Sequence, residues 1–287
     1  MSHADRRTSG AHSPGAHGTG WASRWSFDVA PTIDATVDID ANAIAAIRYS
    51  LPQWIFWDVG LTLVHPSPAL ISAQLSAYDQ VGEGWAASDV LGSLVAAAEA
   101  RHTRWPGVSS GDDRVSLTWA VMLGLPVPEA AALMTACLAR TDLYCEVDTS
   151  APVVLTELAQ RGVRMGVISN SDGSLAEELA HFGLDGYFEV VVDSGIAGVG
   201  KPDRAIFHVA LQAAGARPEQ AWHIGDGLIN DYLAASAVGM RPILLDRHGT
   251  YTGALPAHRI CRLSQVLQLP AFAGAANPVS EGTGQEI

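Results

Sequence analysis

Between residues 151 and 245 one pattern occurs four times: a helix-forming stretch ends at a glycine, and a short apolar run follows. Glycine is favoured just beyond a helix because it readily adopts the left-handed backbone that ends one. The predicted helices cover 151–161, 173–182, 203–214 and 228–238, and the predicted strands cover 163–168, 188–192, 221–224 and 242–245. Helices that alternate with short apolar strands are typical of βα units. We therefore predict an α/β fold with a Rossmann-like parallel sheet.

Another apolar run, Trp54-Ile55-Phe56-Trp57, precedes this region and ends abruptly at Asp58, which indicates one more buried strand. Residues 67–145, which lie between the two, are dominated by alanine and leucine. Glycine and proline divide this stretch into about four predicted helices, near 67–81, 87–104, 112–123 and 127–140. The folded part of the chain is thus predicted to comprise an α/β core, 51–64 and 148–270, and an inserted helical domain, 65–147.

Both ends of the chain differ in composition from this folded part. Residues 1–25 are polar, small and rich in histidine and glycine, so they cannot bury enough apolar surface to offset the entropy of ordering. We expect a disordered tail over 1–25, an N-terminal extension packed outside the core over 26–50, and a loose C-terminal tail over 271–287.

The overall charge argues against several classes of partner. Acidic residues outnumber basic ones by 30 to 17, which gives a formal net charge of -13. Nucleic acids and anionic membranes are bound by basic patches, so we expect neither as a partner. No apolar run approaches the roughly 18–20 residues of a membrane span. Three scattered cysteines (Cys137, Cys145 and Cys261) do not form a disulfide framework, so we expect reduced thiols and a cytoplasmic location, with the oligomeric state left open.

Polar side chains follow the predicted strands, where ligands bind in sheets of this kind. They are Asp58, Ser169, Asn170, Lys201, Asp226 and Asp231. Because the carboxyl ends of parallel strands meet at one edge, we expect these side chains to converge. The set suits phosphoryl transfer, in which one carboxylate attacks phosphorus, a hydroxyl and an ammonium hold the phosphoryl oxygens, and other carboxylates hold Mg²⁺.

The ammonium group in this set has no substitute. Lys201 is the only lysine of the chain, beside sixteen arginines. Any mechanism that needs an amine must therefore use Lys201, and chemistry that needs a lysine inside the helical insertion is excluded.

Four segments, in this order, resemble the motifs of the haloacid dehalogenase (HAD) superfamily. They read Trp57-Asp58-Val59-Gly60-Leu61-Thr62-Leu63, Gly166-Val167-Ile168-Ser169-Asn170-Ser171, Gly200-Lys201-Pro202-Asp203 and Gly225-Asp226-Gly227-Leu228-Ile229-Asn230-Asp231. The resemblance covers about residues 52–250 and implies a HAD-like core. The helical insertion falls where one subclass of the superfamily carries a cap, which closes over the active site and selects the substrate.

The resemblance also implies a role for each residue of the motifs. Asp58 and Lys201 are the implied catalytic residues, with Asp58 as the nucleophile. The implied phosphoryl-binding residues are Thr62, Ser169, Asn170 and Lys201, and the implied Mg²⁺ ligands are Asp58, the backbone carbonyl of Gly60, Asp226 and Asp231. The expected function is Mg²⁺-dependent, phosphatase-like hydrolysis of a small phosphorylated metabolite. Polar cap residues are candidates for substrate contact, namely Arg101, His102, Arg104 and Arg114, while His223 is expected to lie in the core or to support the site.

One position departs from the family pattern. Phosphatases of the superfamily carry a second aspartate two residues after the nucleophile, which protonates the leaving oxygen and later activates water. Here that position is Gly60, and the usual glycine after it is Leu61. General acid–base help is worth roughly 10²–10⁴-fold in rate. His65 and Asp172 are the nearest candidates in the sequence to replace the acid, and Gly60→Asp is expected to reinstall it.

Two other interpretations stay open because of this departure. A chain without the acid is compatible with a non-catalytic protein that binds a phosphorylated ligand or a partner. It is also compatible with a 2-haloacid dehalogenase, although that branch lacks the metal motif found here at 225–231. Phosphonoacetaldehyde hydrolases also lack the second aspartate, but they use a lysine of the cap, and this chain has none.

Overall fold

The computed structural model describes residues 51–76, 87–138, 140, 142–251 and 258–273. Its centre is a six-stranded parallel sheet with the order β5-β4-β1-β6-β7-β8. The strands are β1 (Trp54–Trp57), β4 (Arg164–Ser169), β5 (Val190–Asp193), β6 (Ala221–Gly225), β7 (Arg241–Leu245) and β8 (Arg259–Ile260). This sheet confirms the predicted α/β class. The segments 1–25 and 26–50, and most of 271–287, lie outside the described residues.

Strand β1 lies in the middle of the sheet because it pairs on one side with β4 and on the other with β6. All four of its side chains are buried, which is why the run is continuously apolar rather than alternating. Its register places Trp57 beside Val167 and Ile224. The residues that directly follow these three strands therefore meet at one edge of the sheet.

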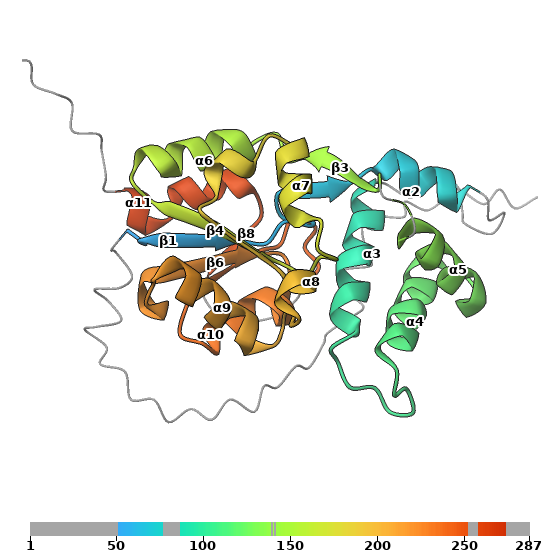
Figure 1. Cartoon of the computed structure of the whole chain (residues 1–287). Coiled ribbons are helices and arrows are strands. Elements are labelled where there is room, and N and C mark those ends of the chain that lie inside the picture. The colour runs from blue at the N-terminus through green and yellow to red at the C-terminus, as the bar shows by residue number, and fades with distance from the viewer. Residues whose placement is uncertain (1–50, 77–86, 139, 141, 252–257, 274–287) are drawn as a thin grey trace, which may run out of the picture.

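Helices cover both faces of the sheet (Figure 1). One face carries α6 (Ala151–Gln160), α7 (Leu175–His181) and α11 (Pro270–Ala273), and the other carries α9 (Arg204–Ala214) and α10 (Ala234–Ser236). Leu155 and Leu179 share a buried cluster with Trp57, whereas Phe207 shares another with Phe56. Alternate residues of β1 thus enter opposite halves of the core. The remaining short segments are α8 (Ser194–Ala197), η1 (Asp185–Tyr187), η2 (Pro218–Gln220) and η4 (Leu263–Gln268).

The helical insertion leaves the core through β2 (Val64–Pro66) and returns through β3 (Tyr144–Val147), and these two strands pair antiparallel. Between them lie α2 (Pro68–Leu75), α3 (Ala87–Ala100), α4 (Gly111–Leu123) and α5 (Val127–Leu138). The insertion stands beside the carboxyl edge of the sheet (Figure 1). It encloses an apolar cluster of its own around Trp119 and Leu133. We call this insertion the cap.

Two findings bear on the expectations drawn from composition. No single described helix is long and apolar enough to cross a membrane, and α4 and α5 meet that criterion only as a pair bent by 106°. The three cysteines are free thiols, with Cys137 buried and the other two exposed.

The structure differs from the predicted elements at several short strands and at one helix. The strands β2, β3 and β8 are not predicted, because runs of two to four residues carry too few positions for a pattern. The single helix predicted over 228–238 is instead a π-helical segment, η3 (Leu228–Leu233), followed by α10. In η3 the backbone N–H of Tyr232 reaches the carbonyl of Gly227, five residues earlier, at 3.0 Å. Such wide turns frequently occur at functional sites.

Candidate active site

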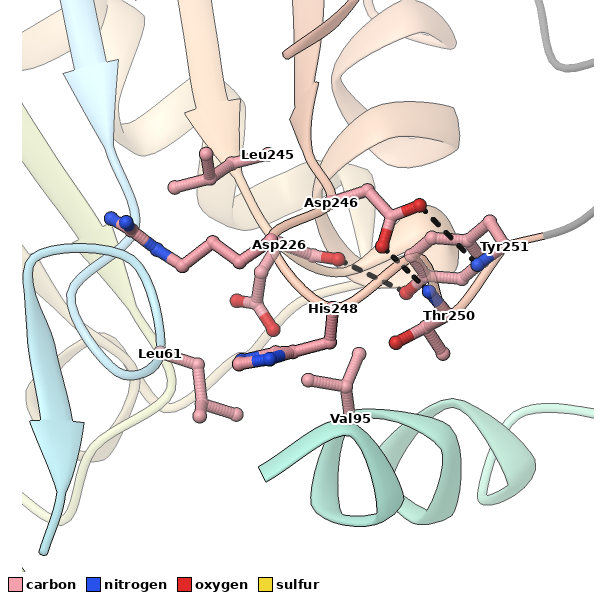
Figure 2. A pocket seen from close by; sticks show the side chains of 9 residues that line it. Leu61, Val95, Asp226, Leu245, Asp246, His248, Thr250 and Tyr251 are labelled. Carbon is pink, nitrogen blue, oxygen red and sulfur yellow. Dashed lines mark hydrogen bonds between the residues drawn. The ribbon is translucent and has the colours of Figure 1, made fainter. Parts of the chain in front are cut away.

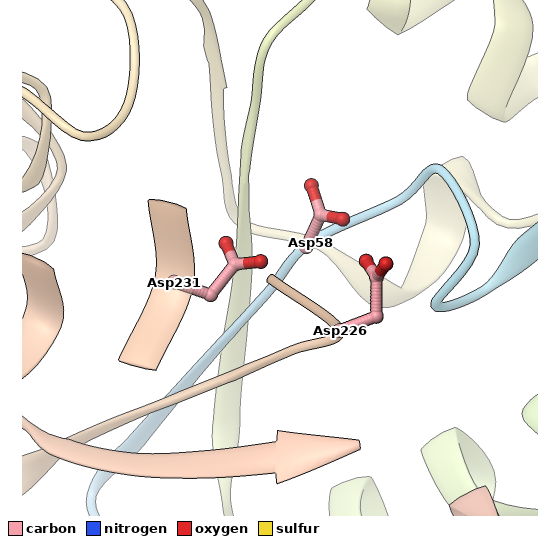
Figure 3. Close-up of side chains that lie close together, drawn as sticks. All are labelled: Asp58, Asp226 and Asp231. Atoms are coloured by element: carbon pink, nitrogen blue, oxygen red, sulfur yellow. The ribbon is translucent and has the colours of Figure 1, made fainter. Parts of the chain in front are cut away.

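Three carboxylates from separate elements converge at the carboxyl edge of the sheet (Figure 3). Asp58 directly follows β1, Asp226 directly follows β6, and Asp231 lies in η3. One oxygen atom of each lies within 4.8 Å of the others. Asp58 and Asp231 are buried, and Asp226 is half-buried. Because like charges this close disfavour ionisation, the cluster requires a compensating cation.

Lys201 supplies one positive charge to this cluster. Its Nζ donates hydrogen bonds to Asp58 Oδ1 and Asp231 Oδ1, each at 2.6 Å. Burial by itself lowers the pKa of Lys201, but Asp231 and Asp58 outweigh it and raise that pKa above its ordinary value. The amine is therefore held in its charged form, which suits it to bind an anion and not to act as a nucleophile.

The pKa values of the three carboxyl groups diverge. Burial raises the pKa of Asp58 in spite of the opposing charge of Lys201. Burial and the charges of Asp58 and Asp231 raise the pKa of Asp226 well above its ordinary value. Burial favours the neutral form of Asp231 too, but Lys201 and His223 outweigh it and lower the pKa. One ammonium does not balance three carboxylates, and a hard divalent cation such as Mg²⁺, which prefers oxygen ligands, fits this donor set.

Local packing holds Asp231 in place. Its Oδ2 accepts from the backbone N–H of Gly227 at 2.9 Å, and its Oδ1 lies 2.9 Å from His223 Nε2. A Cβ at position 225 would lie 2.3 Å from Asp231 Cγ, so only glycine permits this approach. His223 is fully buried in β6, and its contact with Asp231 makes it a positioning residue.

Ser169 and Asn170, which are predicted to bind the phosphoryl group, differ in the hydrogen bonds that their side chains form. Ser169, the last residue of β4, is buried, and its hydroxyl has no hydrogen bond with any described residue. Asn170 instead clamps Lys201: its Oδ1 accepts from the backbone N–H at 2.7 Å, and its Nδ2 donates to the carbonyl at 2.9 Å. The side-chain amide of Asn170 therefore holds the backbone of Lys201, and a contact of Asn170 with the phosphoryl group stays a prediction.

The turn after β1 is unusual in its backbone as well as in its residues. Leu61 has a φ of 61°, a left-handed conformation that glycine adopts with less strain. Its side chain is buried in one cluster with Val95 of α3, and the two face each other in Figure 2. Burial of a leucine contributes ~1.5–3 kcal/mol, which offsets a backbone cost of ~1–2 kcal/mol. Thr62 Oγ1 lies 3.4 Å from Asp58 Oδ2 and 3.3 Å from Asp226 Oδ1, so its one hydroxyl hydrogen bonds to either carboxylate but not to both at once.

The ring of Tyr144 covers Gly60. Tyr144 begins β3, where the cap returns to the core. A Cβ at position 60 would lie 3.4 Å from Tyr144 Cε1 and 4.0 Å from Cδ1 and Cζ. Burial, together with the charges of Asp226 and Asp58, raises the pKa of the Tyr144 phenol above its ordinary value. A side chain at position 60 would therefore start in van der Waals contact with the ring, and the phenol lies within electrostatic reach of two carboxylates.

Glu99, near the end of α3, is a buried carboxyl group that extends from the cap to the core. Its Oε2 accepts from the backbone N–H of Ile229 at 2.9 Å. Burial raises its pKa to about 8, with the charge of Asp231 adding to the effect and the hydrogen bond from Ile229 opposing it. Sequence reasoning missed this residue, although one signal was present, since Glu99 is the only charged residue over 90–100.

A pocket opens beside Asp226, between the cap and the core (Figure 2). It is lined by Leu61, Val95, Asp226, Leu245, Asp246, Arg247, His248, Thr250 and Tyr251. The Tyr251 hydroxyl donates to the Asp226 carbonyl at 3.0 Å and accepts from the Leu228 backbone N–H at 3.1 Å. Arg247 donates to the Thr62 carbonyl at 3.0 Å. The loop after β7 therefore fastens two turns that carry site residues.

Neither residue proposed from the sequence as a replacement acid gains support from the structure. His65 Nε2 lies 3.6 Å from Asp148 Oδ2. The Asp172 carboxylate is exposed and accepts from the backbone N–H and the hydroxyl of Ser174. Within the described residues both side chains are therefore engaged away from Asp58.

The charged cap residues predicted as candidates for substrate contact mainly form contacts within the cap. Arg114 donates to the backbone carbonyls of Ala100, Arg101, Val108 and Ser109. Arg101 pairs with Asp112 at the surface at 2.6 Å, and Arg104 is exposed. Burial, followed by the charges of Arg101 and Arg114, lowers the pKa of His102. These contacts hold the turn between α3 and α4 and do not reach the carboxylate cluster.

The chain combines a parallel sheet, a helical cap, and a buried cluster of two aspartates and a lysine at the carboxyl edge of the sheet. This combination is typical of one class of hydrolases. The haloacid dehalogenase-like hydrolase family matches residues 56–239, and the chain belongs to this family. The matched range starts within β1 and ends after α10, so it includes all four motifs and the cap. The resemblance found in the sequence is thereby confirmed.

Individual relatives match over shorter stretches. The chain is 50% identical over 84 residues to haloacid dehalogenase-like hydrolase domain-containing protein 3 of Xenopus laevis, covering 29% of this chain and 34% of that protein. It is 36% identical over 109 residues to phosphoserine phosphatase of Thermus thermophilus, covering 38% and 42%. Each match thus spans less than half of the curated relative. The structure of Bacillus subtilis YfnB bound to magnesium shares the fold, with a TM-score of 0.56 and 16% identity over 77% of this chain and 99% of that one.

Proposed function

We propose that this protein is a Mg²⁺-dependent, phosphatase-like hydrolase of a small phosphorylated molecule that acts through an aspartyl-phosphate intermediate. The observation that carries the proposal is the buried cluster in which Lys201 bridges Asp58 and Asp231 while Asp226 lies beside them. Membership of a hydrolase family supports hydrolysis. The phosphoserine phosphatase among the relatives supports phosphoryl transfer, and the magnesium in the Bacillus subtilis structure supports the choice of metal.

In this mechanism Asp58 attacks phosphorus, and the Lys201 ammonium and the free Ser169 hydroxyl hold the phosphoryl oxygens. Lys201 pairs with both Asp58 and Asp231. It therefore stays bound to Asp231 when the phosphoryl group replaces Asp58 as its other partner. The carboxylates of Asp58, Asp226 and Asp231, with the carbonyl of Gly60, would hold Mg²⁺. The ion would reduce the repulsion between an anionic nucleophile and an anionic substrate. Water then hydrolyses the aspartyl phosphate and regenerates Asp58.

The test is a screen of small phosphorylated metabolites and p-nitrophenyl phosphate, with and without Mg²⁺, on the full chain and on Asp58→Asn. We expect Mg²⁺-dependent phosphate release that falls by at least ~10³-fold in Asp58→Asn. Urea unfolding of both proteins checks that the variant is folded. No release above the Asp58→Asn level on any compound would favour a non-catalytic binding protein. Halide release from 2-haloacids without metal would favour a dehalogenase.

Several features of this proposal rest on composition alone. These are the cytoplasmic location and the expectation that neither nucleic acid nor membrane is bound, which stay predictions from the charge of -13 and the cysteine pattern. The small phosphorylated partner is a prediction from the motifs and the family that they resemble.

A further inference from the structure

Two distant parts of the chain meet where a phosphatase of this family would place its acid. Gly60, two residues after Asp58, has no side chain to donate a proton. Tyr144 Cε1 lies 3.4 Å from the point where a Cβ would stand, and Cζ, which carries the hydroxyl, lies 4.0 Å from it. A side chain from β3 therefore lies against the position that is bare in the turn after β1.

The Tyr144 hydroxyl is available to a ligand. Tyr144 as a residue is 38% exposed, and its hydroxyl forms no hydrogen bond within the described part of the chain. The nearby phenol of Tyr251 differs, because its hydroxyl is engaged by the Asp226 carbonyl and the Leu228 backbone N–H. Because the Tyr144 hydroxyl has no partner among the described residues and its ring lies against the turn after Asp58, it is free to donate to a bound substrate.

We propose that the Tyr144 hydroxyl donates to the leaving-group oxygen of the phosphate ester, in place of the side chain missing at Gly60. This inference rests on the proposed function, since it concerns the leaving group of that reaction. First, an oxygen of Asp58 bonds to phosphorus, the bond from phosphorus to the leaving oxygen breaks, and that oxygen keeps the electron pair and takes the phenol proton. Next, a water oxygen bonds to phosphorus, the bond to Asp58 breaks, and a water proton returns to Tyr144. The sum is ester plus water to alcohol plus phosphate.

The same geometry changes the expectation for Gly60→Asp. A Cβ at position 60 would already be in van der Waals contact with the ring, at 3.4 Å from Cε1, so we expect the carboxyl group beyond it to compete with the Tyr144 side chain for space. We therefore no longer expect Gly60→Asp by itself to raise turnover of alkyl phosphates. An aspartate at position 60 is expected to act as the acid only when the Tyr144 ring is removed as well.

The first test compares the wild type with Tyr144→Phe on two substrates. One is p-nitrophenyl phosphate, whose leaving group departs without a proton, and the other is the best alkyl phosphate of the screen, whose leaving group needs one. We expect kcat/KM for the alkyl phosphate to fall by ~10²-fold or more and that for the aryl phosphate to change by less than ~3-fold. Tyr187→Phe, which removes a surface hydroxyl that lies 3.1 Å from Thr156 Oγ1, is the matched control and leaves both values unchanged.

Several outcomes would overturn the inference while the proposed function stands. They are equal losses on both substrates, no loss on either, or a wild type that hydrolyses only the aryl phosphate. A wild type no better than Asp58→Asn on both substrates removes the proposed function, and the inference falls with it. That result is recognised without any Tyr144 variant.

The second test uses rescue, which a merely structural role of Tyr144 would not produce. Gly60→Asp, Tyr144→Ala and the double variant are assayed on the alkyl phosphate. We expect Gly60→Asp alone to give no gain, and the double variant to recover at least ~10-fold of the rate lost in Tyr144→Ala. A gain in Gly60→Asp alone would show that an aspartate at position 60 does not compete with Tyr144 for space. No recovery in the double variant would show that the two side chains do not donate the same proton.

Discussion

Charged side chains are placed differently at the sheet edge and in the cap. At the edge, Lys201, Asp58 and Asp231 lie against one another with side-chain exposures of 3%, 11% and 3%. In the cap, Arg101 and Asp112 pair with exposures of 48% and 76%. Burying a charge is unfavourable unless it is paired and hydrogen-bonded, and at the sheet edge each buried charge has such a partner. The burial of the charges, more than their number, distinguishes the candidate site from the surface of the cap.

The cap nevertheless contributes to the site, through two side chains that lie at its boundaries. Glu99 sits near the end of α3 and binds the backbone of η3, and Tyr144 begins the strand that leads back to the core. Glu99 is buried, unlike the surface arginines of the cap, whereas Tyr144 is partly exposed beside the site. The contrast between buried and exposed charge therefore holds inside the cap as well, and it can be tested by substitution.

The largest effect on stability is expected for Lys201→Met. The variant leaves Asp58 and Asp231 buried without their common partner, and breaking a buried pair costs ~3–5 kcal/mol. Urea unfolding at neutral pH measures this loss. Arg217→Met is the matched control, because Arg217 and its partner Glu219 have side-chain exposures of 69% and 49%. Such surface pairs contribute at most ~1 kcal/mol. Equal losses in the two variants would contradict the distinction between the two regions.

The pH dependence of stability should reveal the buried carboxyl of the cap. The folded-state pKa of Glu99, about 8, lies above its ordinary value of 4.5. Between these values the folded state binds more protons at this site than the unfolded chain, so stability falls as pH rises through this window. Glu99→Gln should remove this contribution, which is at most ~5 kcal/mol. Urea unfolding below, within and above the window measures it.

Glu146→Gln is the control for that experiment, because Glu146 is an exposed residue of β3. Its decline in stability with pH should follow that of the wild type. A Glu99→Gln variant that loses stability with pH as steeply as the wild type would show that Glu99 is not the group responsible.

Arg114→Ala should affect the stability of the cap and leave the chemistry intact. It removes four hydrogen bonds to backbone carbonyls, and we expect a loss of ~1–3 kcal/mol with kcat/KM changed by less than ~3-fold. Arg104→Ala, at an exposed position nearby, should change stability by no more than ~0.5 kcal/mol. A rise in KM of tenfold or more in Arg114→Ala would mean that a cap charge contacts the substrate, against the division described above.

The smallest effect concerns the turn that joins the two regions. At Leu61, where φ is 61°, Gly should be more stable than Ala by ~1 kcal/mol, because glycine carries no penalty in this conformation. Urea unfolding of Leu61→Gly and Leu61→Ala measures the difference. Leu63, fully buried and without a positive φ, is the control, and there the order should reverse. The same order at both positions would remove the argument for strain at Leu61.

Much of the core could be predicted because its signals are local. Each βα unit carries its own apolar run and terminal glycine, and the residue after each strand is fixed once the strand is known. The predicted helix over 228–238 failed because the wide turn of η3 depends on the bond from Tyr232 to Gly227 and on the fit of Asp231 against Gly225. The bonds from both ends of the Asn170 amide to the backbone of Lys201 were not predicted, because the position of Asn170 in its motif does not show them.

The order of residues along the chain was enough to place Asp58, Lys201, Asp226 and Asp231 at one edge, because parallel strands align their carboxyl ends. It was also enough to show that the second aspartate is missing. Only the folded molecule places the ring of Tyr144 on Gly60 and the carboxyl of Glu99 on η3. These contacts join segments far apart in the sequence, and they depend on how the whole cap packs against the core. No local pattern carries that information.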